Sequence, residues 1–326
     1  MDLEEVNSLV KAEEQWRKCE CINLIASENV TSPAVDAAYA SDFSHRYAEG
    51  EPFKRYYNGT RYIDELEQKT TELAKQVLRA RDVDLRPISG TVANIAAFAF
   101  LVKPGSLVLS NATAAGGHIS HNSRGAVGLV GGKPVAFPVA EDYFHLDVDK
   151  TIALIEEKSK SENQAERIST LVFGCSLFLF PQPIREIAPA AKASGCRIAF
   201  DAAHVLGLVA AGLFQDPLRE GAELMTSSTH KTFFGPQGGL IASELSDEEW
   251  GKCKSRVFPG VTSNHHLHRI PALAVALLEF QKFGAEYARQ VVANAKAFAQ
   301  ALSEAGFKVC GEEFGFTESH QVAIDV

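Results

Sequence analysis

The stretch Arg197-Ile198-Ala199-Phe200-Asp201-Ala202-Ala203-His204 decides the fold class. It begins as a short apolar run and ends in a polar turn, which is typical of a strand that is buried on both faces. Similar runs recur on either side of it, separated by segments of helical periodicity. We predict strands at 106–110, 134–138, 170–174, 197–200, 224–227 and 239–242. This alternation predicts an α/β fold with a mostly parallel sheet and helices on both faces.

Helices are predicted between and around these strands. They are expected at 64–80, 92–101, 147–158 and 183–193, followed by two long helices at 271–280 and 286–305 and two strands at 307–310 and 321–326. At about 150 residues per domain, 326 residues suggest two domains. We expect an N-terminal helical arm at 1–30, a large domain at 31–278, and the beginning of a smaller α+β C-terminal domain at 279–326. Because the sequence stops within a predicted strand, we expect the natural chain to continue for ~100 residues.

Composition limits the classes of function. Lys and Arg number 32 against 41 Asp and Glu, a net charge of −9, which argues against a nucleic-acid partner. No apolar run approaches the ~18 residues of a membrane helix, and the N-terminus lacks the basic and apolar regions of a signal peptide. The six cysteines include no Cys-x-x-Cys pair and are interpreted as reduced thiols. We therefore expect a cytoplasmic protein with no membrane partner.

A lysine and an aspartate carry the most specific chemical signal. Lys231 follows a predicted strand in Ser227-Ser228-Thr229-His230-Lys231-Thr232. A lysine withdrawn from water can lose its proton and bond covalently to an aldehyde, although most loop lysines are simply solvated. Asp201 lies 30 positions earlier, at the carboxyl end of a strand, where open α/β sheets bind ligands. An anion for a ring nitrogen together with such a lysine fits pyridoxal 5′-phosphate (PLP); the alternative for Asp201 is a helix N-cap.

Two glycine-containing segments extend this hypothesis. Ile88-Ser89-Gly90-Thr91 precedes an apolar helix, so its free N–H groups could hold a phosphate, or the segment could be an ordinary N-cap. His118 follows two glycines and could stack on a flat cofactor ring. The alternative is a metal pair with His121, and the cluster His265, His266 and His268 raises the same alternative. Both are disfavoured because zinc sites usually need three or four convergent ligands. Phosphate-loop and dinucleotide-binding glycine motifs are absent, which disfavours a nicotinamide cofactor.

Taken together, these segments resemble serine hydroxymethyltransferase, a PLP-dependent family of the aspartate aminotransferase fold (fold type I). The resemblance covers nearly the whole chain. Besides the motifs quoted above, it rests on Asn23-Leu24-Ile25-Ala26-Ser27-Glu28-Asn29, Arg46-Tyr47-Ala48-Glu49-Gly50, Lys54-Arg55-Tyr56-Tyr57 and Val257-Phe258-Pro259-Gly260. Phe178-Leu179-Phe180-Pro181 and Asn264-His265-His266 resemble the archaeal branch of the family.

The resemblance implies a role for each matching residue. Lys231 would bind PLP covalently, Asp201 would pair with the ring nitrogen, and His118 would stack on the ring. Further cofactor contacts are implied for Ser176, His204, Gly90, Thr91, Ser228, His230 and Asn264. Glu49 is implied as the acid/base group with Tyr47 and Tyr56 beside it, and Ser27, Tyr56 and Tyr57 would position the amino acid. The family builds its sites at a homodimer interface, so Tyr47, Tyr57 and residues 263–264 would serve the neighbouring subunit. No metal is implied.

The implied reaction interconverts serine and glycine and transfers a one-carbon unit to a reduced pterin, either tetrahydrofolate or tetrahydromethanopterin. Gln237, Thr113 and residues 261–264 depart from the common family pattern, which leaves the pterin open. The family's arginine for the substrate carboxylate would lie beyond Val326. Two alternatives stay open: a PLP-dependent aldolase or transaldolase on threonine-like β-hydroxy amino acids, and a catalytically impaired fragment that acts only as an interaction partner.

Overall fold

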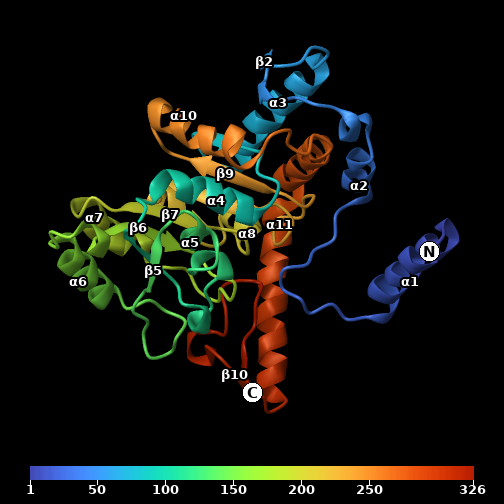
Figure 1. Cartoon of the computed structure of the whole chain (residues 1–326). Helices are drawn as coiled ribbons and strands as arrows, with labels where there is room; N and C mark the ends of the chain where they lie inside the picture. Colours follow the sequence, from blue (N-terminus) through green and yellow to red (C-terminus); the bar gives the residue numbers. More distant parts are fainter.

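The centre of the computed structural model, which describes residues 1–326, is a seven-stranded sheet (Figure 1). The strand order is β3-β9-β8-β7-β6-β4-β5. Its strands are β3 (Asp82–Asp84), β4 (Leu107–Ser110), β5 (Lys133–Ala136), β6 (Ile168–Phe173), β7 (Arg197–Asp201), β8 (Leu224–Ser228) and β9 (Gly239–Ser243). Strands β5, β4, β6, β7 and β8 pair in parallel, whereas β9 and β3 pair antiparallel at one edge. The predicted α/β class and the mostly parallel sheet are confirmed.

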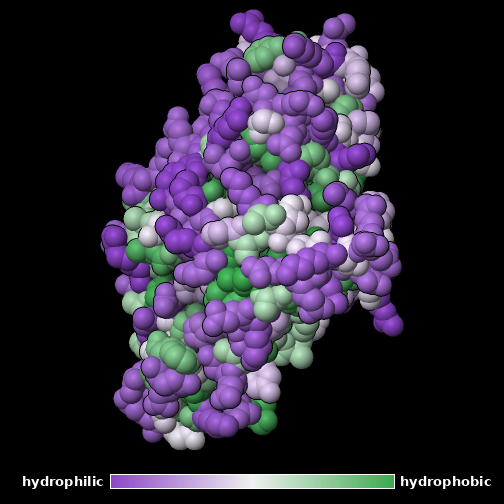
Figure 2. Space-filling view, turned by 90° about the vertical axis from the view of Figure 1, so that its left-hand side faces the viewer, coloured by the Kyte–Doolittle hydropathy of each residue, from purple (hydrophilic) through white to green (hydrophobic).

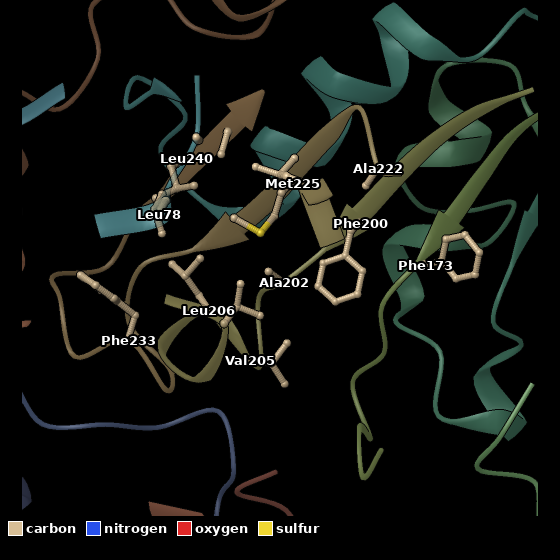
Figure 3. Close-up of a cluster of buried hydrophobic side chains, with 14 of the residues drawn as sticks. Leu78, Phe173, Phe200, Ala202, Val205, Leu206, Ala222, Met225, Phe233 and Leu240 are labelled. Atoms are coloured by element: carbon tan, nitrogen blue, oxygen red, sulfur yellow. The ribbon is translucent and has the colours of Figure 1, made fainter. Parts of the chain in front are cut away.

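Helices cover both faces of this sheet. They are α3 (Arg61–Leu78), α4 (Gly90–Leu101), α5 (Ala126–Leu129), α6 (Val148–Ser159), α7 (Ile184–Ala193), α8 (Leu206–Ala210), α9 (Pro217–Glu220), α10 (Asp247–Ser255) and α11 (Arg269–Glu304). Successive strand residues point to opposite faces, because side chains alternate along a strand. Phe200 thus joins the larger core with α7, α8 and α11, and Ala199 joins a second core with α4, α5 and α10. Figure 3 shows Phe200, Phe173 and Met225 in the larger core.

The helix α11 corrects one sequence prediction. The sequence suggested two helices, at 271–280 and 286–305, but a single helix runs through Arg269–Glu304. The intervening residues contain no proline. Gly284 packs closely on the Phe280 ring, where a larger residue would not fit because its Cβ would lie 2.6 Å from that ring. The predicted domain boundary between residues 278 and 279 falls inside this helix. The division into domains stays a prediction.

The N-terminal segment lies away from the sheet. Helix α1 (Leu3–Gln15) contains no buried residue and projects from the body on an extended connection (Figure 1). It is followed by α2 (Pro33–Tyr39) and by the hairpin of β1 (Gly50–Glu51) and β2 (Lys54–Arg55). At the other end of the chain, β10 (Lys308–Val309) pairs with β11 (Ile324–Asp325), close to the last turns of α11.

The surface is predominantly hydrophilic where Figure 2 displays it, with hydrophobic patches between the hydrophilic residues. None of the helices combines the length and the apolar character needed to cross a membrane.

Candidate active site

The carboxyl ends of the parallel strands surround a cavity of about 180 Å³. Strand β7 ends at Asp201, β8 ends at Ser228, and Lys231 lies three residues after β8. Because parallel strands end at the same edge of a sheet, these residues meet although the chain separates them. The cavity is lined by Ser89, Gly90, Thr91, Asn94, His118, Cys175, Asp201, Ala203, His204, Ser228, His230 and Lys231. We call it the Lys231 cavity.

Lys231 contributes a primary amine to this cavity. Its Nζ donates a hydrogen bond to Ser228 Oγ at 2.9 Å, and its backbone carbonyl accepts one from Asn29 Nδ2 at 2.6 Å. Burial lowers the pKa of Lys231 below its usual value, and the negative charge of Asp201 opposes this shift only in part. A larger fraction of the amine is therefore unprotonated at neutral pH than for a solvated lysine, which suits a nucleophile.

Asp201 supplies a fixed negative charge. Its Oδ2 accepts hydrogen bonds from Asn94 Nδ2 at 2.7 Å and His121 Nε2 at 3.0 Å, and its Oδ1 accepts one from the Ala203 N–H at 3.0 Å. Burial opposes ionisation of the carboxyl group, but the bond and positive charge of His121, with the bonds from Asn94 and Ala203, hold the pKa of Asp201 well below its usual range. Such an anion can keep a heterocyclic nitrogen protonated.

One end of the cavity is suited to a phosphate. Helix α4 begins there at Gly90, and the first N–H groups of a helix have no partner within the helix. Gly90 packs against Ser228 so closely that a Cβ would lie 3.2 Å from the Ser228 nitrogen. Behind this contact, the buried Arg269 guanidinium donates to the carbonyls of Leu85, Pro87 and Gly239. The turn that presents the helix terminus is thereby held rigidly.

Three histidines around the cavity are neutral at pH 7. Burial and the nearby Lys231 charge lower the pKa of His204 to about 3 and that of His230 to about 4. The pKa of His118 is also lowered, chiefly by burial. Its Nδ1 lies 2.7 Å from Ser120 Oγ, which fixes the ring beside the cavity. A neutral, fixed imidazole can stack on a flat ring without adding a charge.

The structure reveals site residues that the sequence analysis did not assign. Asn94 and His121 both donate to Asp201. Asn94 lies three residues after the segment at 88–91, and the sequence analysis considers His121 only as a metal ligand. Gln321 donates to the carbonyl of Ser176 at 2.7 Å, and the His320 ring stacks on His204 at 5.8 Å. These last two contacts join segments more than 100 residues apart, and no local sequence pattern signals them.

The remaining predicted residues lie outside the Lys231 cavity. Ser176 is in the adjacent turn, and Ser27 lines a neighbouring larger cavity that also includes Lys231. Glu49 accepts a hydrogen bond from the Tyr57 hydroxyl at 3.2 Å, and the Tyr57 ring packs edge-on to that of Tyr47. Tyr56, Ser263 and Asn264 lie in the same region. We call Glu49, these three residues, Tyr47 and Tyr57 the Glu49 cluster. In a single chain, the residues around Glu49 and the residues of the Lys231 cavity are therefore two separate parts of the predicted site.

The two metal alternatives lack a suitable arrangement of ligands. His121 is bound to Asp201, and His265 is bound to Glu67. Nowhere in the chain do three or more His, Cys, Asp or Glu side chains converge in positions that could hold a metal ion. By contrast, three features around one cavity fit the aldehyde, ring nitrogen and phosphate of PLP: an amine of lowered pKa, a fixed carboxylate, and the N-terminus of α4. Ser89 Oγ caps the Val92 N–H there, as an ordinary N-cap does, and leaves the N–H groups of Gly90 and Thr91 for a phosphate.

Comparisons with known proteins agree with this chemistry. The family described as "Serine hydroxymethyltransferase" matches residues 1–326. Relatives with that name are 48% identical over 325 residues in Saccharolobus islandicus, 52% identical over 324 residues in Methanosphaera stadtmanae and 46% identical over 325 residues in Sulfolobus acidocaldarius. The matches cover 99–100% of this chain and 73–74% of each relative. The chain therefore belongs to the serine hydroxymethyltransferase family, whose members are PLP-dependent enzymes.

Proposed function

We propose that the serine hydroxymethyltransferase activity of this chain takes place at the Lys231 cavity, with PLP bound to Lys231. One observation carries the proposal: the Lys231 amine and the Asp201 carboxylate line the same cavity, although 30 positions separate them in the chain. Serine and glycine are the amino-acid substrates, and a reduced pterin, tetrahydrofolate or tetrahydromethanopterin, accepts the one-carbon unit. The location is cytoplasmic, and neither a nucleic acid nor a membrane is a partner.

Each residue of the cavity has a distinct task in this proposal. Asp201 Oδ2 would keep the ring nitrogen protonated, and Asn94 and His121 hold that oxygen in place. Lys231 would hold the cofactor through its aldehyde, and its amine would hold or move a proton beside the amino-acid substrate. His118 would stack on the ring. Bound PLP supplies an electron sink for bond cleavage, so the protein's contribution is orientation and electrostatics.

The phosphate and the phenolic side of the ring are assigned to the rest of the cavity. Gly90 and Thr91 at the start of α4, with Ser228 and His230, hold the phosphate. His204 and Ser176 bind near the ring hydroxyl, where Gln321 fixes the Ser176 backbone. Ser27 lies beside Lys231 in the adjoining cavity and contacts the amino-acid substrate. In this arrangement one end of the cavity, with Asp201, faces the ring of the cofactor, and the other end, at the start of α4, faces its phosphate.

The Glu49 cluster is proposed to serve the site of a second subunit. In one chain it does not line the Lys231 cavity. Its tyrosines are strongly exposed, Tyr47 to 60% and Tyr56 to 73% of their surface, and exposed aromatic residues are enriched at protein interfaces. In a homodimer with shared sites, Glu49 would be the acid/base group with Tyr47 and Tyr56 beside it. Tyr57 would position the amino acid, and Asn264 would contact the partner's cofactor.

Dependence on a pterin tests the proposed reaction. We expect glycine release from serine by the PLP-loaded protein to increase when a reduced pterin is added, because the pterin accepts the one-carbon unit. The measurement is the rate of glycine formation with no pterin, with tetrahydrofolate and with tetrahydromethanopterin. Equal rates in all three would instead favour the aldolase or transaldolase alternative.

Glu49→Gln tests the assignment of the acid/base group. We expect kcat for pterin-dependent transfer to fall by about 10²- to 10⁴-fold, the range for loss of a general acid–base group, with PLP still bound to Lys231. The matched control is Glu51→Gln. Glu51 is an exposed carboxylate two residues after Glu49, and it pairs with Arg86 and Lys254. If the two variants had the same kcat, Glu49 would not be the acid/base group.

A further inference from the structure

The segment that carries Glu49 is held by a buried arginine. We call residues 46–57 the Glu49 segment; it includes the hairpin of β1 and β2. The Arg55 side chain is only 1% exposed. Its Nη1 donates to the carbonyls of Ala48 and Gly50, both at 2.7 Å. These carbonyls belong to the residues immediately before and after Glu49, so one guanidinium group fixes the backbone on both sides of it.

The other nitrogens of Arg55 bind α3. Nε donates to Asp64 Oδ1 at 2.7 Å, and Nη2 donates to Glu67 Oε2 at 2.6 Å. Both carboxylates are buried, with side-chain exposures of 5% and 7%. They are held in turn by the Thr60 hydroxyl at 2.9 Å and by His265 Nε2 at 3.2 Å. Arg55 therefore joins the Glu49 segment to a helix that packs on the body of the molecule.

Asn264 holds the same backbone through a different pair of groups. Its Oδ1 accepts from the Ala48 N–H at 2.9 Å, and its Nδ2 donates to the Arg46 carbonyl at 3.0 Å. Gly50 completes the turn with φ +102°, where a Cβ would lie 2.7 Å from the Lys54 carbonyl oxygen. By contrast, the partners of the Glu49 carboxylate are the hydroxyls of Tyr57 and Ser263. The carboxylate is thus presented from a fixed backbone.

We propose that Arg55 is a positioning residue that sets where Glu49 presents its carboxylate to the reacting groups. This inference rests on the proposed acid/base role of Glu49. The planar guanidinium donates in four fixed directions at once, to two carbonyls and two carboxylates, and a lysine ammonium cannot reproduce that geometry. Displacement of a catalytic group by about 1 Å can cost about 10²-fold in rate. Arg55 thereby affects the reaction without contacting a substrate.

Arg55→Lys is the appropriate variant because it keeps a positive charge between the buried carboxylates, whose loss would be strongly destabilising. We expect kcat to fall about 10- to 100-fold, with KM for serine changed less than about threefold. In the protein without PLP, the Ala48 and Tyr56 N–H groups donate to Asn264 Oδ1 and to the Glu49 carbonyl. We expect hydrogen exchange of these two amides to be faster in the variant by about tenfold or more. The absorbance of PLP bound to the variant should match that of the original protein.

Arg197→Lys is the matched control. Arg197 also bridges two carboxylates, those of Glu223 and Glu249, but lies at the start of β7, at the opposite end from Asp201. We expect this variant to leave kcat and the exchange of residues 46–57 unchanged. A general effect of replacing a bridging arginine would instead appear in both variants and would contradict a specific role for Arg55.

Glu49→Gln, measured alongside, separates the inference from the proposed function. Unchanged kcat in Glu49→Gln overturns the acid/base role and the inference with it. Low kcat in Glu49→Gln but normal kcat and exchange in Arg55→Lys overturns the inference alone. If Arg55→Lys does not fold, Thr60→Val is used, since the Thr60 hydroxyl holds the Asp64 carboxylate that binds Arg55 and has no assigned contact with the cofactor or a substrate. Faster exchange at Ala48 and Tyr56 in that variant without PLP, with lower kcat once loaded, supports the inference, and unchanged exchange overturns it.

Discussion

Replacing Lys231 with alanine is expected to lower kcat for the serine–glycine reaction by at least about 10³-fold, the scale on which loss of a covalent catalytic group acts. The variant loses the only amine that lines the cavity, and with it the covalent attachment of PLP and a proton carrier near the substrate α-carbon. The measurement combines steady-state rates of glycine formation with the visible absorbance of the protein after incubation with PLP.

The effect should be specific to this position. Lys252→Ala is the control, because Lys252 is an exposed lysine on α10 that pairs with Glu248 far from the cavity. We expect it to retain the original kcat and absorbance. If Lys231→Ala retained more than about a tenth of the original kcat, the amine would have no covalent role and the assignment of the cavity would be wrong.

Asp201→Asn is expected to lower kcat by about 10²- to 10³-fold, comparable to the removal of one preorganised electrostatic partner. Asparagine keeps the shape of the side chain and can still accept bonds from Asn94 and His121, but it lacks the negative charge that holds a proton on the ring nitrogen. The electron-withdrawing capacity of the bound ring would therefore decrease. Kinetics are measured at saturating PLP, so that weaker cofactor binding does not account for the loss.

The matched control for Asp201 is Asp142→Asn. Asp142 also accepts bonds from a histidine, His145 Nδ1 at 2.7 Å, and from the backbone N–H groups of Phe144 and His145. It lies outside the Lys231 cavity. We expect kcat to be unchanged in this variant. Equal kcat in Asp201→Asn and the original protein, with PLP bound in both, would show that the ring nitrogen needs no anion from Asp201.

The parallel sheet and the Lys231 cavity were largely predictable from the sequence because their signals are local. An apolar run such as 197–200 indicates a buried strand, and a polar residue at its end lies at the ligand-binding edge of the sheet. Strand β3 and the hairpin of β1 and β2 were not predicted. They are two or three residues long and rich in charged residues, and they depend on tertiary pairing.

Contacts between segments that are distant in the sequence could be predicted less well. Gln321 was interpreted only as the first residue of a strand, and His320, which precedes it, had no assignment. The structure packs them on Ser176 and His204, respectively. The close packing of Gly284 on the Phe280 ring within the continuous helix α11 was likewise not visible in the periodicity of the sequence. The position of Glu49 relative to Lys231 stays a prediction, because it depends on a second subunit rather than on the fold of one chain.

The central claim is that Lys231 binds the aldehyde of PLP beside the Asp201 carboxylate. Borohydride reduction of the PLP-loaded protein, followed by mass spectrometry of its peptides, tests this claim most directly, because reduction makes the bond between the lysine and the cofactor permanent. We predict a phosphopyridoxyl group on the peptide that contains Lys231 and on no other lysine. Labelling of a different lysine, or of none in folded protein, would contradict the account.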